Sequence, residues 1–377
     1  MANHDKLPWD LIEEILSCVP PESLVRFRTV SKQWNALLSA KTFIKKHKTK
    51  MTYRFILATR SKIYSVRVNP NIEVRDLTSD IPALESQLPL TRRLIDCDGL
   101  LLCDMGKRAM VSNPWLRQTR WVEHEGNHRS FEFSGIGYDD DNRYKTLGTH
   151  WTELDPTKTF WKTLDLSSDA WKEQSGVMEP SGTTSSSTTE EGTRVTIHST
   201  SGVSLNGTWY RVGSYEKTKY SFFIVNFDFT KETFNHFVIC HGIYGRSVSL
   251  LKQSHLTKKI QIWVTKNKID HKQDGRYVEW MNFMEVSIPN MPDLIQPSYF
   301  INDKRLVVCS SDNDGRAWIY VLGNNNLISK TKIDLVVDSW ASHCSFIPSL
   351  VSVPGGKRRS GMTSLVSLHS PSCLVLE

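Results

Sequence analysis

The chain has 377 residues, of which 39% are hydrophobic and 23% charged, with a formal net charge of +7 at pH 7. This composition is that of a globular protein, and the length exceeds one ordinary core, so we expect a small module with one large domain, or two to three domains. No apolar stretch approaches the roughly 18 residues that cross a bilayer, so we expect no membrane partner.

The N-terminal residues and the cysteines predict the compartment. The first residues, MANHDKLPWD, lack the basic region and apolar run of a secretory signal. The seven cysteines are scattered and form no C-x-x-C pair, which fits reduced thiols better than a disulfide framework. We therefore predict a protein of the cytoplasm, the nucleus or both, and interpret the sequon at Asn206 as an Asn-Gly turn.

The first 50 residues predict a small helical unit. Pro8 is suited to a first helical position, and the helix after it has one apolar side. That side is formed by Leu11, Ile12, Ile15, Leu16 and Val19. The Pro20-Pro21 pair ends this helix, a second begins near Glu22, and a third carries Trp34 and is extended by KTFIKKH (41–47). Three short helices bury too little surface to be stable alone, so another part of the chain or another protein must cover them.

Positive charge is concentrated in the same unit. Residues 1–24 carry one Lys against five acids, whereas residues 25–50 carry eight Lys or Arg and no acid. A nucleic-acid-binding surface usually shows a broad basic stripe. Because the excess here is local, we interpret it as the solvated face of a helix and expect no nucleic-acid partner.

Two segments of this unit, LPWDLIEEIL (7–16) and SLVRFRTVSKQW (23–34), together resemble an F-box. The resemblance implies a module that binds a Skp-family adaptor and, through it, a cullin and a RING subunit. The adaptor-binding residues it implies are Leu7, Pro8, Ile12, Leu16, Leu24, Phe27, Arg28, Val30 and Trp34. Two departures, Ser31 in place of the usual Cys and SCVP (17–20) in place of the commoner R-L-P, are small and uncharged.

From about Met51, short runs of Val, Ile, Tyr, Phe and Trp alternate with turn residues, which predicts a mostly antiparallel β domain. A strand–turn–strand shape recurs, with anchors at Asn69, Asn113, Asp165, Asp228, Val286 and Leu322. The spacings of 44, 52, 63, 58 and 36 residues average about one propeller blade. We predict a six-bladed β-propeller, with a two-sheet β domain as the alternative, and hence an α+β, multidomain chain.

Several of the same segments, among them DCDGLLLC, VSNPWLRQTRWVE, VSLNGTWYRV and FFIVNFDFTKETF, resemble the type-one F-box-associated domain of plant F-box proteins over about residues 88–334. The family has Tyr-Trp after the Asn-Gly turn, where this chain has Trp209-Tyr210. The resemblance implies a domain that recruits target proteins, which differ from member to member.

These observations predict three regions. Residues 1–47 form the F-box, residues 48–350 form the β domain, and residues 351–377 form a flexible tail. The polar segment Pro180–Thr193 is expected to be a flexible loop. Trp115, which follows Asn113-Pro114 on a turn, is expected to be an exposed aromatic residue.

One string looks catalytic. HEGNH (His124–His128) matches H-E-x-x-H, in which His124 and His128 would bind zinc and Glu125 would act as base. That chemistry requires a helix, and Gly126 and Asn127 disfavour one, so we expect a hairpin loop here and an exposed turn at YDDDNRY (138–144). We predict no catalytic residue, no metal and no cofactor.

The sequence therefore predicts a non-catalytic substrate-recognition subunit of a Skp–cullin–F-box (SCF) ubiquitin ligase, which recruits a target protein for ubiquitination and proteasomal degradation. Two alternatives remain: an adaptor-binding protein that acts outside a ligase, and a zinc-dependent hydrolase that uses His124, Glu125 and His128. The sequence identifies neither the target nor the residues that bind it.

Overall fold

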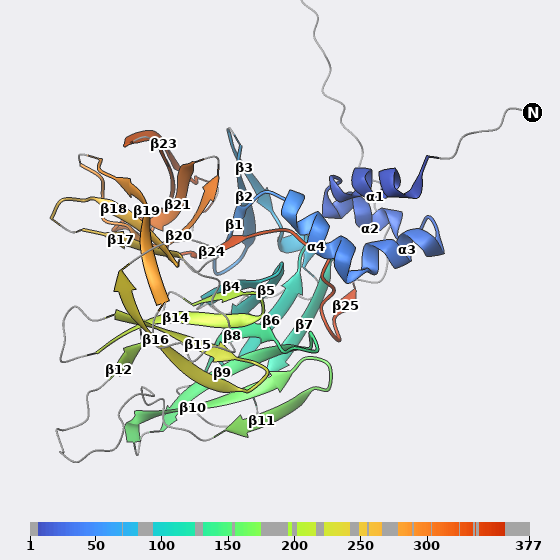
Figure 1. Cartoon of the computed structure of the whole chain (residues 1–377), viewed down its shortest axis with the longest axis horizontal. Helices are drawn as coiled ribbons and strands as arrows, with labels where there is room; N and C mark the ends of the chain where they lie inside the picture. Colours follow the sequence, from blue (N-terminus) through green and yellow to red (C-terminus); the bar gives the residue numbers. More distant parts are fainter. Residues whose placement is uncertain are drawn as a thin grey trace, which may run out of the picture.

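The computed structural model places a small helical unit against one side of a ring of β-sheets (Figure 1). It describes residues 7–69, 71–81, 93–124, 131–152, 155–174, 195–197, 202–215, 222–241, 249–254, 256–265, 278–288, 290–302, 304–323, 325–334, 336 and 339–358. The helices are α1 (Trp9–Ser17), α2 (Pro21–Phe27), α3 (Lys32–Ser39) and α4 (Lys41–Lys50). None of the helices in these ranges has the length and apolar character needed to span a bilayer.

Prolines and one serine set the boundaries of the helices. Pro8 directly precedes α1, and Pro21 is the first residue of α2, where its missing N–H breaks no helical hydrogen bond. Ser31 caps α3, because its Oγ accepts a hydrogen bond of 3.1 Å from the backbone N–H of Trp34. The Ser that stands in place of the usual Cys thus stabilises the start of a helix.

The helical unit has four helices rather than the three predicted. Ala40 is extended, with φ −70° and ψ 131°, and separates α3 from α4. A continuous helix over residues 32–50 would be about 28 Å long and straight. The break instead turns α4 back, so that Phe43 and His47 are buried. KTFIKKH was wrongly predicted to extend the third helix, because Ala40 carries no sequence signal for a break.

The β domain is a six-bladed propeller, which confirms the predicted fold and excludes the two-sheet alternative (Figure 1). Blade 1 consists of β24 (Ser342–Phe346), β1 (Arg54–Ala58), β2 (Ile63–Asn69) and β3 (Asn71–Asp76), and a 3-10 turn, η1 (Thr78–Asp80), follows it. Blade 2 consists of β4 (Arg93–Cys97), β5 (Leu100–Asp104), β6 (Arg108–Asn113), β7 (Gln118–Glu123) and β25 (Lys357–Arg358). Blade 3 consists of β8 (Glu132–Tyr138), β9 (Tyr144–Thr152), β10 (Asp155–Asp165) and β11 (Ala170–Gln174).

Blades 4, 5 and 6 complete the ring, and blades 4 and 5 share one continuous sheet. Blade 4 consists of β12 (Val195–Ile197), β13 (Val203–Leu205), β14 (Thr208–Tyr215), β15 (Phe222–Asp228) and β16 (Thr233–His241). Blade 5 consists of β17 (Ser249–Gln253), β18 (Ile260–Thr265) and β19 (Val278–Val286). Blade 6 consists of β20 (Ile295–Asn302), β21 (Arg305–Ser311), β22 (Ala317–Gly323) and β23 (Asn326–Lys332). Parallel pairing of β16 with β19 joins blades 4 and 5.

The six repeat anchors all mark the end of the third strand of a blade. Five of them are the last residue of β2, β6, β10, β15 and β19, and Leu322 is the last but one of β22. Asn and Asp recur there because their side chains accept hydrogen bonds from backbone N–H groups of the following turn. Asn113 Oδ1 accepts from Trp115 at 3.1 Å, and Asp228 Oδ1 accepts from Thr230 at 2.8 Å.

The Asn-Gly dipeptide forms the expected turn. Asn206 and Gly207 have φ values of 50° and 81° and join β13 to β14 as a two-residue hairpin loop. Trp209 and Tyr210, which follow this turn in the reverse of the family's order, are both buried. They are neighbours on β14 and point to opposite faces of the sheet, so Trp209 (1% exposed) and Tyr210 (3% exposed) belong to two different core clusters.

The C-terminal part of the described chain closes the ring. β24 pairs with β1 over five residues, from Arg54↔Phe346 to Ala58↔Ser342. The chain then runs back over blade 2 in residues 347–358, here called the return segment. Asn113 Nδ2 donates hydrogen bonds to the carbonyl oxygens of Ser349 (3.1 Å) and Val351 (2.8 Å). The segment ends as β25, which pairs with β7.

Two described elements, α4 and the return segment, lie at the predicted domain boundaries. α4 continues to Lys50, beyond the predicted end of the F-box at residue 47. In the predicted tail (351–377), residues 351–358 are described and belong to blade 2, where Val353 is 4% exposed. The predicted loop Pro180–Thr193 lies outside the described residues.

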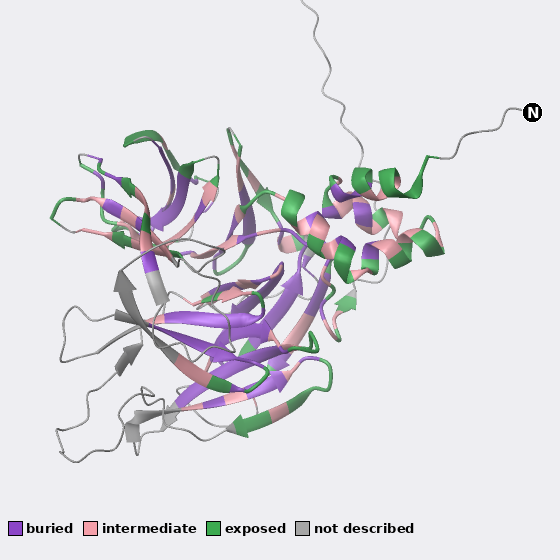
Figure 2. Ribbon diagram, viewed as in Figure 1, coloured by how far each residue is buried: buried purple, intermediate pink, exposed green. Residues whose placement is uncertain are grey.

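Apolar clusters fill the spaces between neighbouring blades, and Figure 2 shows that many residues of the blade strands are buried. Trp115 was wrongly predicted to be exposed and is only 5% exposed. Its ring stacks on Phe346 with 4.9 Å between centroids, and the Arg54 guanidinium covers it at 4.9 Å. Burial between blades 1 and 2 gives this ring an apolar environment that its place on a turn did not indicate.

Candidate functional site

The helical unit exposes a set of large apolar side chains, here called the exposed apolar surface. Its members are Leu7 (49% exposed), Trp9 (41%), Leu11 (51%), Ile15 (56%) and Val30 (64%). They are five of the eleven large hydrophobic residues that are exposed in the described part of the chain, although the helices are a small part of it. Figure 2 shows the exposed side of α1 turned away from the propeller. Exposed apolar surface at this density marks a protein interaction site.

The opposite side of the helical unit packs against the propeller. The buried members there are Leu16, Leu24, Leu38 and Phe43, each at most 3% exposed. They form one cluster with Leu116, from the turn between β6 and β7, and Leu350, from the return segment. The apolar arc of α1 therefore serves two contacts: Leu11 and Ile15 point outward, and Leu16 points inward.

The nine residues predicted to bind the adaptor divide between these two environments. Leu7, Pro8 and Val30 are exposed, Ile12, Phe27, Arg28 and Trp34 are half-buried, and Leu16 and Leu24 are buried. The rings of Phe27 and Trp34 meet edge to face at 5.5 Å. The predicted set omitted Leu11 and Ile15, although their spacing of four residues places both on one side of α1.

Arg28 makes contacts inside the chain. Its Nη2 donates hydrogen bonds to the carbonyl oxygens of Leu38 (3.1 Å) and Leu350 (3.3 Å). The first lies in the last turn of α3, where a positive charge is also favoured by the helix dipole. The second lies in the return segment, so one guanidinium ties two helices to the propeller.

Part of the basic excess of residues 25–50 is neutralised by neighbours. Lys46 forms ion pairs with Glu13 (3.1 Å) and Glu14 (2.9 Å), and Lys50 pairs with Glu14 (3.2 Å). The hydrogen bond from Lys46 lowers the pKa of Glu14, and the hydrogen bond to Glu14 raises the pKa of Lys46. Lys48 pairs with Asp98, in the turn after β4. These pairs clamp α1 and the propeller to α4.

His124, the first residue of HEGNH, belongs to a cluster of aromatic side chains. The ring of His124 stacks on Phe131 with 3.7 Å between centroids and meets Trp171 edge to face at 5.8 Å. His124 follows the last residue of β7, and its backbone N–H donates to the Lys107 carbonyl at 3.1 Å. Glu125 and His128 lie outside the described residues.

The acidic segment at residues 138–144 is the turn between β8 and β9, as predicted. Asp139 binds Arg143 through an ion pair of 2.9 Å and accepts a hydrogen bond of 3.0 Å from its backbone N–H. Among the described residues, no group of three or more His, Cys, Asp or Glu side chains is arranged to hold a metal ion.

Comparisons with known proteins agree with this arrangement. Residues 5–46 match the family model of the F-box domain, and residues 54–353 match that of the F-box associated beta propeller domain. An F-box protein of Arabidopsis thaliana is 52% identical over 94% of this chain and 97% of its own length. An F-box/kelch-repeat protein of the same plant is 50% identical over 93% and 94%.

Solved structures are more distant. The structure of a hypothetical selenium-binding protein from Sulfolobus tokodaii aligns with 79% of this chain and over 79% of its own length, with 12% identity and a TM-score of 0.38.

Proposed function

Because the chain belongs to the F-box proteins that carry an F-box associated β-propeller domain, we propose that it is the substrate-recognition subunit of an SCF ubiquitin ligase. In this role its F-box binds a Skp-family adaptor, and through it a cullin and a RING subunit. Its propeller binds a target protein, which is ubiquitinated and degraded by the proteasome. The observation that carries the proposal is the exposed apolar surface on the F-box side that faces away from the propeller.

The exposed apolar surface provides the anchors that the adaptor would bury. Aliphatic and aromatic side chains that fill a partner's groove supply most of the affinity of such interfaces. Leu7, Leu11 and Ile15 are about half exposed and therefore have area to lose to a partner. Leu16 and Leu24 would contribute indirectly, because their packing holds the helices in the arrangement that exposes those anchors.

The contribution of this chain to ubiquitin transfer is proximity. A rigid link between adaptor and target raises the local concentration of the target at the site where other subunits transfer ubiquitin. Arg28, Lys48 and Leu350 supply that rigidity, because each of them joins the F-box to the propeller. The catalytic chemistry then belongs to those other subunits.

Substitution within the exposed apolar surface tests the proposal. Ile15→Asp places a charge where the adaptor would bury an apolar side chain, and we expect at least about tenfold weaker adaptor binding. The double variant Leu7→Ala/Pro8→Ala is expected to act in the same direction. Ile328→Asp is a matched control, because Ile328 on β23 is 50% exposed and far from the F-box in sequence and in the ring.

The measurement is co-purification of a Skp-family adaptor and a cullin with each variant. Wild-type binding by Ile15→Asp would overturn the proposal. Binding of the adaptor without the cullin would instead favour a protein that acts outside a ligase. Leu16→Asp is unsuitable, because Leu16 is 3% exposed and a buried charge there would unfold the unit.

A further inference from the structure

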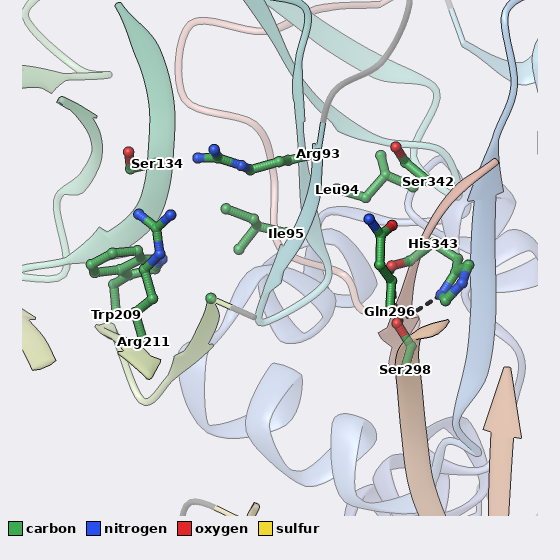
Figure 3. A pocket seen from close by; sticks show the side chains of 11 residues that line it. Arg93, Leu94, Ile95, Ser134, Trp209, Arg211, Gln296, Ser298, Ser342 and His343 are labelled. Carbon is green, nitrogen blue, oxygen red and sulfur yellow. Dashed lines mark hydrogen bonds between the residues drawn. The ribbon is translucent and has the colours of Figure 1, made fainter. Parts of the chain in front are cut away.

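A small cavity lies in the channel at the centre of the propeller (Figure 3). Its volume is about 50 Å³, and its lining comes from β4, β8, β14, β20 and β24, in blades 1, 2, 3, 4 and 6. Arg93 and Arg211 approach it from one side, and Gln296, Ser298 and His343 from the other. Pockets for whole small molecules are typically about 300–1,000 Å³. The space therefore suits one chemical group at the tip of a larger ligand.

The cavity lies toward the end of the ring that is remote from the F-box. Arg93 is the first residue of β4, whereas Asp98, which pairs with Lys48 of the F-box, directly follows its last residue. A strand of this length separates its two ends by about 15 Å. Gln296 and Ser342 likewise lie at the start of β20 and β24. A ligand at this mouth would not compete with the adaptor for the same face of the protein.

Two arginines line this mouth, and no acidic side chain is among its described lining residues. Arg93 Nη2 donates a hydrogen bond of 2.5 Å to Glu132, and the buried Asp104 on β5 also interacts with Arg93. Burial, and then repulsion from Arg93 that exceeds the attraction of Glu132, lowers the pKa of Arg211 to about 10. Arg211 therefore remains protonated at neutral pH, and an anion beside it would relieve both effects.

One neutral donor, on Trp209, lies beside the two charges. Trp209, which the guanidinium of Arg211 approaches at 5.7 Å, is 1% exposed and lines the cavity. Its Nε1–H is buried and donates to no acceptor in the described part of the chain. The Ser298 hydroxyl is already used within the chain, because it donates to the His343 carbonyl oxygen at 3.0 Å and lies 2.9 Å from His343 Nδ1. These contacts fix both side chains at the wall of the cavity. An anionic oxygen in the cavity would offer this donor an acceptor.

We propose that this mouth of the channel binds an anionic oxygen group, a carboxylate or a phosphate, at the tip of an acidic or phosphorylated side chain of the target protein. Guanidinium groups bind both anions through charge-assisted hydrogen bonds. The small volume admits such a group and excludes a whole metabolite. The inference rests on the proposed function only for the source of the anion, since the site itself can be tested without the ligase.

The test measures binding of three Gly/Ser-rich peptides to the purified full chain. The peptides carry a single central phosphoserine, glutamate or serine, and titration calorimetry gives their affinities. We expect the phosphoserine peptide, the glutamate peptide or both to bind at least about tenfold more tightly than the serine peptide. Preference for phosphoserine identifies a phosphate, and equal binding of both shows that a carboxylate suffices.

Three variants locate the site. Gln296→Glu adds a negative charge at an exposed position with almost the same shape, so it is expected to fold normally and to weaken anionic peptides at least about tenfold. Arg211→Gln is expected to do the same. Arg54→Gln is the matched control, because burial also lowers the pKa of Arg54 to about 10 while its guanidinium covers Trp115, away from the cavity.

Equal affinity for all three peptides would overturn the inference, as would unchanged anion binding by Gln296→Glu. An equal loss in Arg54→Gln would also overturn it, because the effect would then be one of general charge. If the chain binds the adaptor but does not prefer anionic peptides, the inference is wrong and the proposed function is unaffected. Conversely, anion binding that persists when Ile15→Asp has lost the adaptor shows that the two sites are independent.

Discussion

Two residues of the F-box pattern, Arg28 and Ser31, make contacts within the chain. Arg28 belongs to the F-box pattern and was assigned to the adaptor, yet its Nη2 is used within the chain, on the carbonyl oxygens of Leu38 and Leu350. Ser31 departs from the pattern and caps α3. A motif identifies the module, but only the folded environment distinguishes the side chains that build the module from those that it presents.

Asp104 gives a pH-dependent prediction. It is 1% exposed, and burial raises the pKa of its carboxyl to about 6. An acid with a raised pKa supports the folded state fully below its unfolded pKa, near 3.9, and this support is lost as pH rises through about 6. Asp104→Asn keeps the oxygen that accepts from Gly106 but cannot ionise. We expect the variant to be more stable than wild type by up to about 3 kcal/mol at pH 8, and to show no such gain at pH 4.

Chemical denaturation at a series of pH values measures this difference. Asp314→Asn is the control for the loss of one carboxylate, because the Asp314 side chain is 66% exposed. If Asp104→Asn and wild type instead show parallel profiles from pH 4 to pH 8, then Asp104 does not carry a burial penalty in the folded protein.

At the scale of elements, the return segment is the part that joins the two domains. Leu350 is 0% exposed and contacts buried side chains of the F-box as well as Leu116 of blade 2. We expect Leu350→Ala to destabilise the protein by about 2–5 kcal/mol, because it leaves a cavity where three parts of the chain meet. Urea denaturation is the measurement, and Leu256→Ala, at a residue that is 95% exposed, is the matched control.

The loss of stability in Leu350→Ala should be largest where the F-box meets the propeller. Relative to wild type, Leu350→Ala should accelerate native-state hydrogen exchange more in α2 and α3 than in blade 6, because Leu350 contacts the helical unit and does not cluster with blade 6. Uniformly faster exchange in all blades would show that Leu350 supports the propeller rather than the junction.

Elements with local signals could be predicted from the sequence, and elements that depend on distant contacts could not. The ends of the third strands were predictable because Asn113, Asp165 and Asp228 bind their own turns. The break at Ala40 and the docking of residues 347–358 were not, because both are determined by tertiary contacts. Trp115 was misplaced for the same reason, since Phe346 covers it from more than 200 positions away.

The same distinction applies to the candidate sites. The F-box could be recognised from residues 7–34, since its pattern is contiguous, although the sequence did not separate Ile15 from Leu16. The cavity in the channel could not be predicted, because Arg93, Arg211 and Gln296 come from three different blades. No spacing in the sequence relates them, and the ring alone brings them together.

At the scale of the whole molecule, the ring places the F-box and the channel mouth at opposite ends of β4, and it does so only while it is closed. Closure depends on β24, which comes late in the described chain and pairs with β1, the first strand of the propeller. Ile56 and Phe55 on β1 are both 0% exposed, in the clusters on either side of blade 1. Without β24, the inner edge of β1 would be left unpaired and open to aggregation.

Two truncations test this dependence. A chain that ends at Ala341 lacks β24 and the return segment, and we expect it to be recovered mainly as aggregates. A chain that ends at Arg358 keeps every described strand. We expect its thermal midpoint to lie within about 2 °C of that of the full chain. In a domain of this size, a change of about 1 kcal/mol in stability moves the midpoint by only a few degrees. Size-exclusion chromatography and thermal unfolding distinguish these outcomes. A monomeric, cooperatively unfolding chain that ends at Ala341 would show that blades 1 and 6 hold the ring shut without the last strand, and the fixed separation between adaptor and channel mouth would then need another cause.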